Sequence, residues 1–488
     1  MMTTDVDAAD LLPAARRLLD AGHRLALVAA HHDPDGAFRA VYLFLGPGDS
    51  RSELTVHLDG RRPQVPSLAE VSFPAGRFER EMHDLFGIRP VGHPLPRRLV
   101  RHYHWPRRWH PMRRDAGPAP EFGEPEGPYP FLEVAGPGVY EIPVGPVHAG
   151  LIEPGHFRFS VVGETILTLK ARLWFVHKGI EKLFEGHRPE DKLALAERIS
   201  GDTAVGHALA YCRAVEDALG IQVPAQAEAI RSVLLELERL YNHIGDIGAL
   251  CNDVGHGILN QHAGRIREQL LRLNAETTGH RLLRGGVVVG GARILTLPDA
   301  DRLTSLADDV AEVVRLALSH TVVRDRFTDT GVLTLDQARD LGTLGYVARA
   351  AGLATDARHD HPGPVPAPPT ALRTEGDVMA RFGIRAEEYQ TSTASIKELT
   401  GTLDGPARQP GSAPAPRSGS GIGITEGWRG TIVHRVEIDR DGRLTRVKVV
   451  DPSFFNWPAL PVALRGAIVP DFPLVNKSFN QSYAGNDL

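Results

Sequence analysis

Cysteine is nearly absent from this chain of 488 residues. Only Cys212 and Cys251 occur, and no pair of cysteines is separated by two residues. A disulfide framework is therefore excluded, and so is any metal or cluster site that needs several thiolates from this chain. So small a number of thiols fits a reducing cytoplasm.

Long apolar runs are also missing. No stretch of the sequence reaches the roughly 18 apolar residues that a bilayer-spanning segment needs. The first residues carry acids, Asp5 and Asp7, where a secretory signal peptide carries basic residues. The net charge of −5 argues against a dedicated nucleic-acid-binding protein. We expect no direct membrane insertion and no nucleic-acid partner, so any membrane role must depend on partner subunits.

Hydrophobic patterning divides the chain into two units. Residues 1–115 predict a small α/β domain, with an amphipathic helix at 8–22 followed by apolar strands. Residues 116–139 are rich in proline and glycine without periodicity, which is typical of a linker or an extended arm. Residues 140–488 predict a larger domain in which strands flank long helices. The predicted fold class is therefore α+β.

The larger unit contains most of the helical signal. Apolar residues at three- to four-residue spacing predict helices over 174–186, 190–220, 225–253, 259–281, 300–326, 335–352 and 374–402. Residues 404–423 are rich in glycine, proline and serine, and they predict a flexible loop. Beyond that loop, Asp441-Gly442 between two apolar runs predicts the turn of a β-hairpin.

A basic, aromatic segment ends the first unit. It contains no acid and interleaves Tyr103, Trp105 and Trp109 with seven arginines, Arg97, Arg98, Arg101, Arg107, Arg108, Arg113 and Arg114. On composition alone this pattern is compatible with nucleic-acid binding, with a protein interface or with a solvated basic face.

The order of residues in this region is more specific than their composition. The segments FEREMHDLFGIRPVGHPLPRRL and WPRRWHPMRRD closely resemble the signature of the smaller peripheral-arm subunit of complex I. The match runs through Glu79, Glu81, Asp84, Phe86, Gly87, His93, Pro94, Arg97, Arg98, His110, Pro111 and Asp115. In that family the segment docks neighbouring subunits, which favours the interface interpretation.

A second group of polar residues lies in VGPVHAGLIEPGHFRFSVVGE, residues 144–164. His148, Glu153 and His156 form either a proton-transfer or metal group, or a set of structural hydrogen bonds, and the structural role is the more common one. The stretch resembles the N-terminal motif of the large subunit of formate hydrogenlyase-type hydrogenases, where it lies near the metal chamber. In complex I a histidine contacts the quinone, and its position corresponds to the neighbourhood of Pro154 in this chain. The quinone-contacting role of that histidine is therefore not carried over.

Two further segments resemble the metal-binding motifs of hydrogenase large subunits. Those motifs supply two cysteines each, because nickel and iron require soft, charged sulfur ligands. In RISGDTAVGHALAY the cysteine places hold Ser200 and Thr203, for which helix N-capping is the simpler role. In NQSYAG they hold Ser482 and Gly485. All four ligands are missing together, so the resemblance implies a repurposed state without nickel.

A further resemblance involves LLELERLYNHIGDIGALCNDVGHG, residues 234–257. In both families the corresponding helix lines the buried chamber. Asp253 aligns with an aspartate linked to proton uptake near the quinone in complex I, which makes it the leading candidate for a coupling group. His243 and Asp246 are three residues apart on the same helix, and a satisfied surface pair is an equally good interpretation.

The resemblance covers residues 20–115 and 140–488. It identifies the chain as a member of the fused large subunits of formate hydrogenlyase and hydrogenase-4-type complexes, in the branch that lacks nickel-binding cysteines. The implied partners are an iron–sulfur small subunit and antiporter-like membrane subunits, at the cytoplasmic side of the membrane. The iron–sulfur cluster is expected in the partner subunit, and this chain is expected to bind no cofactor of its own.

The resemblance also implies a site. We expect the chamber to be lined by the proton-transfer candidates Glu153, Asp253, Arg198, His148 and His156. Two alternatives remain open. One is a quinone-reducing subunit, against which it weighs that Gly201 stands at the place of the complex I tyrosine. The other is a structural scaffold without chemistry.

Overall fold

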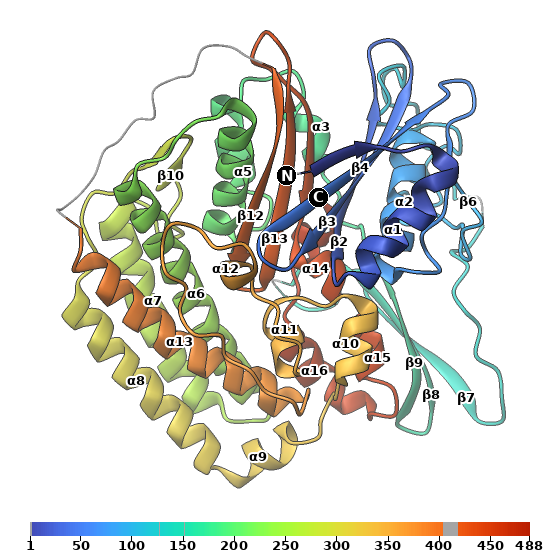
Figure 1. Ribbon diagram of the computed structural model, residues 1–488. Coiled ribbons are helices and arrows are strands. Elements are labelled where there is room, and N and C mark those ends of the chain that lie inside the picture. Colours follow the sequence, from blue (N-terminus) through green and yellow to red (C-terminus); the bar gives the residue numbers. More distant parts are fainter. Residues whose placement is uncertain (1, 126, 151, 404–417) are drawn as a thin grey trace.

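The computed structural model describes residues 2–125, 127–150, 152–403 and 418–488 (Figure 1). The N-terminal part is a four-stranded sheet in the order β1-β4-β3-β2, in which β2, β3 and β4 are antiparallel and β1 runs parallel to β4. The strands are β1 (Met2–Asp5), β2 (Arg24–His32), β3 (Phe38–Gly46) and β4 (Ser50–Leu58). Two helices, a 3₁₀ turn at Ala8–Asp10 and two short strands complete this part: α1 (Leu11–Asp20), α2 (Phe73–Phe86), β5 (Gln64–Pro66) and β6 (Arg89–Val91).

An extended segment joins this part to the rest of the chain. Between β6 and the next strand, the described residues contain neither helix nor strand. The segment carries aromatic side chains that pack on one another; the ring centroids of Trp105 and Phe122, for example, are 5.3 Å apart. It leads into an antiparallel three-stranded sheet made of β7 (Val139–Val144), β8 (His156–Val162) and β9 (Thr165–Arg172).

Long helices form one side of the molecule, and a second sheet separates them from the N-terminal part (Figure 1). The helices are α5 (Ala204–Leu219), α6 (Ala225–Asp253), α7 (Gly257–Thr278), α8 (Ala300–Ser319) and α13 (Val378–Thr400). The second sheet is an antiparallel meander of β12 (Gly419–Gly427), β13 (Gly430–Ile438) and β14 (Leu444–Val450). Ion pairs such as Arg435–Glu53 join this sheet to the N-terminal part.

Shorter elements complete the chain. Before and among the long helices lie α3 (Ile180–Phe184), α4 (Leu193–Ala196), α9 (Thr321–Phe327), α10 (Leu335–Leu341), α11 (Gly345–Ala350) and α12 (Ala357–Asp360), with the short pair β10 (Val287–Val288) and β11 (Gly291–Ala292). The C-terminal end is folded into α14 (Pro452–Asn456), α15 (Ala459–Ala463), α16 (Phe472–Phe479) and α17 (Tyr483–Asp487). The α+β class predicted from the sequence is confirmed.

The prediction of a flexible loop over 404–423 is wrong for its last residues. Residues 404–417 lie outside the described residues, but Gly419, Gly421 and Gly423 belong to β12 and pack directly on α5. A Cβ atom at Gly423 would lie 1.8 Å from the carbonyl oxygen of Ala210. The glycines alternate because every second residue of a strand faces the same way, and only glycine permits so close a backbone approach.

Some predicted helices are shorter than the apolar pattern indicated. The helix predicted at 225–253 is confirmed as α6, but the one at 190–220 is interrupted by a turn at residues 197–203 before α5 begins. The one at 335–352 is interrupted at Gly342, which adopts a left-handed backbone with φ of 69°. These breaks occur where side chains or glycines make tertiary contacts. The spacing of apolar residues along the chain does not reveal such contacts.

Candidate functional site

The turn at residues 197–203 meets the C-terminal end of the chain. The hydroxyl of Ser200 lies 2.8 Å from that of Ser482, although 282 residues separate them. Ser482 begins α17, and its oxygen accepts a hydrogen bond from the backbone N–H of Gly485 at 2.9 Å. Thr203 is joined to the same group through Asp202, which accepts hydrogen bonds from the hydroxyls of both Ser200 and Thr203 at 3.0 Å. The four positions expected from the cysteine motifs therefore form one group, which we call the hydroxyl cluster.

An ion pair fills the centre of the hydroxyl cluster. Arg429 donates two hydrogen bonds of 2.6 Å to the two carboxylate oxygens of Asp202. The indole N–H of Trp428 donates to the Asp202 carbonyl at 3.0 Å, and the Arg429 guanidinium lies 3.9 Å from the Trp428 ring centroid. Desolvation raises the pKa of Asp202, but Arg429 outweighs it and lowers the pKa to about 2. Asp202 is therefore anionic, while 37% of its side chain remains accessible from the surface.

The fourth position is filled by a neighbouring carboxylate. A Cβ atom at Gly485 would lie 2.5–2.9 Å from the carboxyl atoms of Asp451, so a side chain at this position has no room. Asp451 accepts a hydrogen bond from Nε2 of His207 at 3.0 Å, and Nδ1 of His207 lies 3.1 Å from Nε2 of His434. Burial lowers the pKa of His434 far below its ordinary value, so this imidazole is neutral. A buried carboxylate–imidazole–imidazole chain thus adjoins the hydroxyl cluster.

The N-terminus of α5, directly after Thr203, is capped from another helix. Thr203 occupies the N-cap position but makes no side-chain cap bond. Instead Glu238 of α6 accepts hydrogen bonds from the N–H groups of Val205 and Gly206, at 2.7 and 2.9 Å. The N-capping role considered for Ser200 and Thr203 is therefore wrong. Burial raises the pKa of Glu238 to about 8, and the backbone N–H groups that it accepts from oppose the change only in part.

Three of the predicted chamber residues lie around α17. Glu153 accepts a hydrogen bond from the N–H of Ala484 at 3.0 Å, and the rings of His148 and Tyr483 are 6.4 Å apart. His156 contacts the carbonyl of Gly145 at 3.2 Å. Nε2 of His148 is buried without a hydrogen-bond partner among the described residues. This turn therefore adjoins the hydroxyl cluster through α17.

The other two predicted residues are not brought to the cluster. Arg198 is exposed and donates to the carbonyl of Ala194 within its own turn. Asp253 is exposed at the C-terminal end of α6. It lies about 16 Å along the helix axis from Asn242, whose side-chain amide donates a hydrogen bond of 2.8 Å to the carbonyl of Asp202. Partial desolvation of its carboxyl nevertheless raises the pKa of Asp253, and Lys477 opposes the change. Among the described residues, these five side chains are therefore not all brought together, and their roles stay predictions.

The residues of the hydroxyl cluster do not fit a nickel–iron centre. Hydroxyl groups stand where thiolates are needed, and the place of Gly485 is occupied by Asp451. Cys212 and Cys251 are buried on α5 and α6, and burial raises the pKa of both thiols, that of Cys251 to about 12. Within the described ranges, no three histidine, cysteine, aspartate or glutamate side chains are grouped so as to hold a metal ion.

Several residues of the site were missed by sequence reasoning. Asp202, Arg429, Asp451 and Glu238 come from four different segments, and their pairing depends on tertiary structure. One signal was available for Asp202, which stands between the two former cysteine positions of its motif. The interpretation of His243 and Asp246 as a surface pair is also wrong, because both are buried and each binds a residue of α13.

Comparisons with known proteins agree with this architecture. Residues 4–121 match the family "Respiratory-chain NADH dehydrogenase, 30 Kd subunit", residues 178–247 match "Nickel-dependent hydrogenase" and residues 253–416 match "Respiratory-chain NADH dehydrogenase, 49 Kd subunit". Formate hydrogenlyase subunit 5 of Escherichia coli (strain K12) is 34% identical over 448 residues, which cover 88% of this chain and 78% of that protein. Hydrogenase-4 component G of the same strain is also 34% identical, over 88% of this chain and 77% of its own length.

More distant relatives extend the comparison. A protein of the NADH-quinone oxidoreductase of Phocaeicola vulgatus is 30% identical over 69% of this chain and 70% of that protein. A chain from the structure of the membrane-bound sulfane sulfur reductase, an archaeal respiratory membrane complex, superposes with a TM-score of 0.66 and 26% identity, over 72% of this chain and 99% of that one. The fold and these matches define a fused, complex I-like oxidoreductase subunit. The chain belongs to the family of formate hydrogenlyase subunit 5 and the hydrogenase-4 large subunit. Across the described residues, no helix combines the length and apolar character needed to cross a membrane.

Proposed function

We propose that this chain is the large subunit of a membrane-associated redox complex, and that it takes part in electron transfer or ion coupling without a nickel–iron centre of its own. The observation that carries the proposal is the hydroxyl cluster, in which Asp202 and Arg429 form an ion pair at the place where related subunits assemble a metal site. The kinship with formate hydrogenlyase subunit 5 and with the sulfane sulfur reductase chain supports assembly into such a complex.

The surface beside the cluster favours a docked partner. Val147 and Ile152, on the turn that reaches α17, are 85% and 40% exposed. Exposed apolar side chains of this kind commonly mark protein contacts. We place the iron–sulfur small subunit here, so that its cluster faces Asp202 through the accessible part of that side chain. Antiporter-like membrane subunits then anchor the assembly at the cytoplasmic side of the membrane.

The chemistry available to this chain is electrostatic and protonic. An electron that arrives near Asp202 adds negative charge beside the ion pair. The positively charged Arg429 guanidinium is the group that is attracted to the added charge. The His207–Asp451 pair lies in the same cluster and can hold a proton at Nε2 of His207.

The test is a pair of substitutions in the purified intact complex. Asp202→Asn and Arg429→Lys each remove the two-pronged ion pair but retain similar size. We expect assembly with the iron–sulfur protein to persist while turnover with the native donor and acceptor falls. Lost assembly with no separate effect on turnover supports the scaffold role instead. Unchanged turnover in both variants contradicts the proposal.

A second candidate is reduction of a quinone. Nε2 of His148, which has no hydrogen-bond partner among the described residues, and the exposed Val147 offer a polar contact next to an apolar one, which suits a quinone ring. The relative from an NADH-quinone oxidoreductase also favours it. A photoreactive quinone analogue should then label residues 144–155 in the intact complex, and an excess of unmodified quinone should suppress the labelling. Labelling confined to partner subunits contradicts this candidate.

A further inference from the structure

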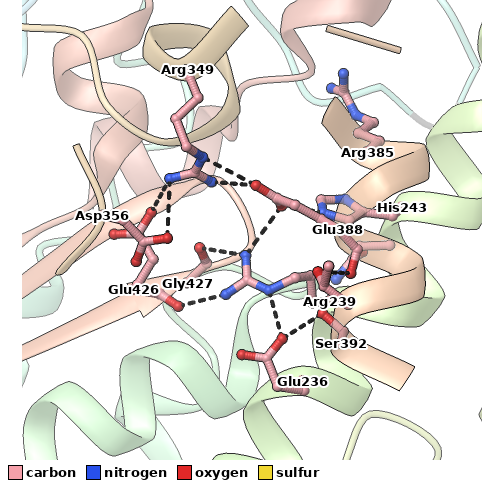
Figure 2. Close-up of polar contacts among 12 residues, drawn as sticks. Glu236, Arg239, His243, Arg349, Asp356, Arg385, Glu388, Ser392, Glu426 and Gly427 are labelled. Atoms are coloured by element: carbon pink, nitrogen blue, oxygen red, sulfur yellow. Dashed lines mark hydrogen bonds and ion pairs between the residues drawn. The ribbon is translucent and has the colours of Figure 1, made fainter. Parts of the chain in front are cut away.

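A buried network of charged side chains lies on the helical side of the molecule (Figure 2). It joins α6, α13, β12 and the segment 349–358, and none of its side chains is more than 12% exposed. Its members are Glu236, Arg239, His243, Arg349, Asp356, Arg358, Glu388 and Glu426. None of the residues proposed for the redox role belongs to it.

Three of the four carboxylates accept a hydrogen bond from the Nε of an arginine, and Glu236 also accepts one of 3.1 Å from Arg358. Arg358 binds Asp356 through two nitrogens, at 3.0 and 2.6 Å. Arg349 directs Nε and one terminal nitrogen to Glu388, at 3.1 and 2.7 Å. Glu236 accepts a bond of 2.9 Å from Nε of Arg239.

Glu426 shares its arginine with other carboxylates. Among the described residues, its only cationic contact within hydrogen-bonding distance is the remaining nitrogen of Arg349, at 2.8 Å. Its other bonds come from neutral donors, the N–H of Ala357 at 3.1 Å and the hydroxyl of Thr431 at 2.9 Å. The same Arg349 nitrogen lies 3.8 Å from Asp356, so two carboxylates share it.

The charges of the network do not cancel. Glu236, Asp356, Glu388 and Glu426 would contribute four negative charges, and Arg239, Arg349 and Arg358 contribute three positive ones. Leaving a net charge in a water-excluded interior is costly, and proteins avoid it by moving the pKa of one member until it is neutral. A single proton makes the network neutral.

We infer that this network binds one exchangeable proton at neutral pH and that Glu426 carries it. Burial raises the pKa of Glu426, and the charge of Asp356 raises it further, against the opposing effects of Arg349 and Arg358. Burial also acts on Asp356, but Arg358 outweighs it and lowers that pKa to about 2. Two neighbouring carboxyl groups with pKa values moved apart are typical of a pair that shares one proton. Arg24 of β2 also faces Glu426, but it faces Asp360 as well, so it adds no uncompensated charge.

His243 is the other place where the proton can reside. Its Nε2 lies 2.7 Å from Glu388, and its Nδ1 is buried without a partner among the described residues. Burial lowers the pKa of His243. The charge of Glu388 raises this pKa, but the charges of Arg239 and Arg385 lower it, so the ring is neutral while Glu426 holds the proton. Arg385 is itself paired with Asp246 at 2.9 Å and leaves the count unchanged.

A short turn connects the network to the hydroxyl cluster. Glu426 and Arg429 are three residues apart, at the junction of β12 and β13. Arg239 of the network donates to the carbonyl oxygens of Glu426 and Gly427, at 2.9 and 3.2 Å. The Trp428 ring lies between the two groups, with its centroid 6.1 Å from that of His243. Proton release from Glu426 therefore changes the charge next to the turn that positions Arg429. The inference itself concerns this chain alone and does not depend on the proposed function.

The experiment is infrared spectroscopy of the full chain labelled with glutamate that carries ¹³C at the side-chain carboxyl. A protonated carboxylic acid has a carbonyl-stretch band that an ionised one lacks. We expect the wild-type-minus-Glu426→Gln difference spectrum at pH 7 to contain this band, shifted by the label. The matched control, Glu437→Gln, lies outside the network. Burial raises the pKa of Glu437, but Arg435 and Arg39 outweigh it and lower that pKa, so this variant should show no loss of such a band.

Thermal unfolding of the same variants supplies the second measurement. Glutamine reproduces a neutral acid, so Glu426→Gln should lower Tm by less than about 2 °C. Glu437→Gln takes an ionised partner from Arg435 and Arg39 and should lower Tm by more than Glu426→Gln does. A difference spectrum without the carbonyl band overturns the inference, because Glu426 is then ionised. Failure of Glu426→Gln to fold also overturns it, because neutrality at this position is then not tolerated.

Discussion

At the scale of single residues, the site is defined by what replaces each missing ligand. Ser200 and Ser482 bond to each other, Asp202 pairs with Arg429, and Asp451 fills the space beside Gly485. Each of these contacts satisfies a polar group that would otherwise be buried and unpaired.

Gly485 offers a direct test of this packing. Gly485→Ala places a Cβ 2.5–2.9 Å from the Asp451 carboxyl, so we expect a loss of about 1–3 kcal/mol of stability. Gly264→Ala is the control, because a Cβ at that exposed helical position meets no atom within 4 Å. The control should gain about 0.4–1 kcal/mol. Urea unfolding of both variants decides the matter, and a neutral Gly485→Ala contradicts the packing described.

Glu238 gives a prediction for pH dependence. The folded protein holds this proton up to a pKa of about 8, whereas the ordinary value is 4.5. Because the folded state binds more protons in this window, the contribution of Glu238 to stability is fully present below pH 4.5 and is lost as the pH rises towards 8. The free energy of unfolding of the wild type should therefore fall relative to that of Glu238→Gln between pH 4.5 and pH 8. Above pH 8 the difference between the two proteins should stay constant. Denaturant midpoints measured across this range provide the comparison, and a constant difference refutes the assignment.

At the scale of elements, the contact between β12 and α5 determines where the site lies. Gly421 and Gly423 let the strand rest on the helix backbone, which brings the turn with Trp428 and Arg429 to the start of α5. The glycine-rich composition of this segment predicted flexibility instead. A high glycine content indicates conformational freedom. The alternation of the glycines indicates close packing instead, and close packing is what the structure shows.

A substitution on this strand separates the two interpretations. Gly423→Ala brings a Cβ within 1.8 Å of the Ala210 carbonyl oxygen, and we expect a loss of more than about 3 kcal/mol or a failure to fold. Ser420→Ala lies on the exposed side of β12 and should change stability by less than about 0.5 kcal/mol. Equal stability of the two variants, measured by thermal unfolding, argues against the close contact.

The site was predictable from the sequence only in part. The four ligand positions were located because motifs keep their order and spacing along the chain. Arg429, Asp451 and Glu238 were not located, because each acts through a partner more than 30 residues away in sequence. The resemblance placed Asp253 on α6 but did not report how far along the helix it lies from the hydroxyl cluster, and its coupling role stays a prediction.

At the scale of the whole molecule, buried ion pairs hold the N-terminal part against the second sheet. Lys448 of β14 lies 2.6 Å from Glu81 of α2 and 3.1 Å from Glu181 of α3. Arg435 of β13 similarly binds Glu53 of β4 at 2.8 Å. These pairs orient the two parts, because each carboxylate meets its partner in only one relative position.

Removing one such partner should therefore destabilise the molecule strongly. Lys448→Met leaves Glu81 without its cation, and we expect a loss of about 3–5 kcal/mol near neutral pH. The loss should shrink in acid, because burial already raises the pKa of Glu81 and protonation relieves the unpaired charge. Lys182→Met, which removes an exposed pair with Glu185, should cost less than about 1 kcal/mol. Similar losses in the two variants by chemical denaturation contradict the role of Lys448.

The central claim is that the hydroxyl cluster replaces a nickel–iron centre. Nickel content tests it most directly, measured by elemental analysis on the complex purified from cells grown with ample nickel. A hydrogenase large subunit that retains its cysteines, prepared in the same way, serves as the positive control. We predict no nickel above background for this chain and stoichiometric nickel for the control. One nickel per chain, lost on substitution of Ser200 or Ser482, would contradict the account.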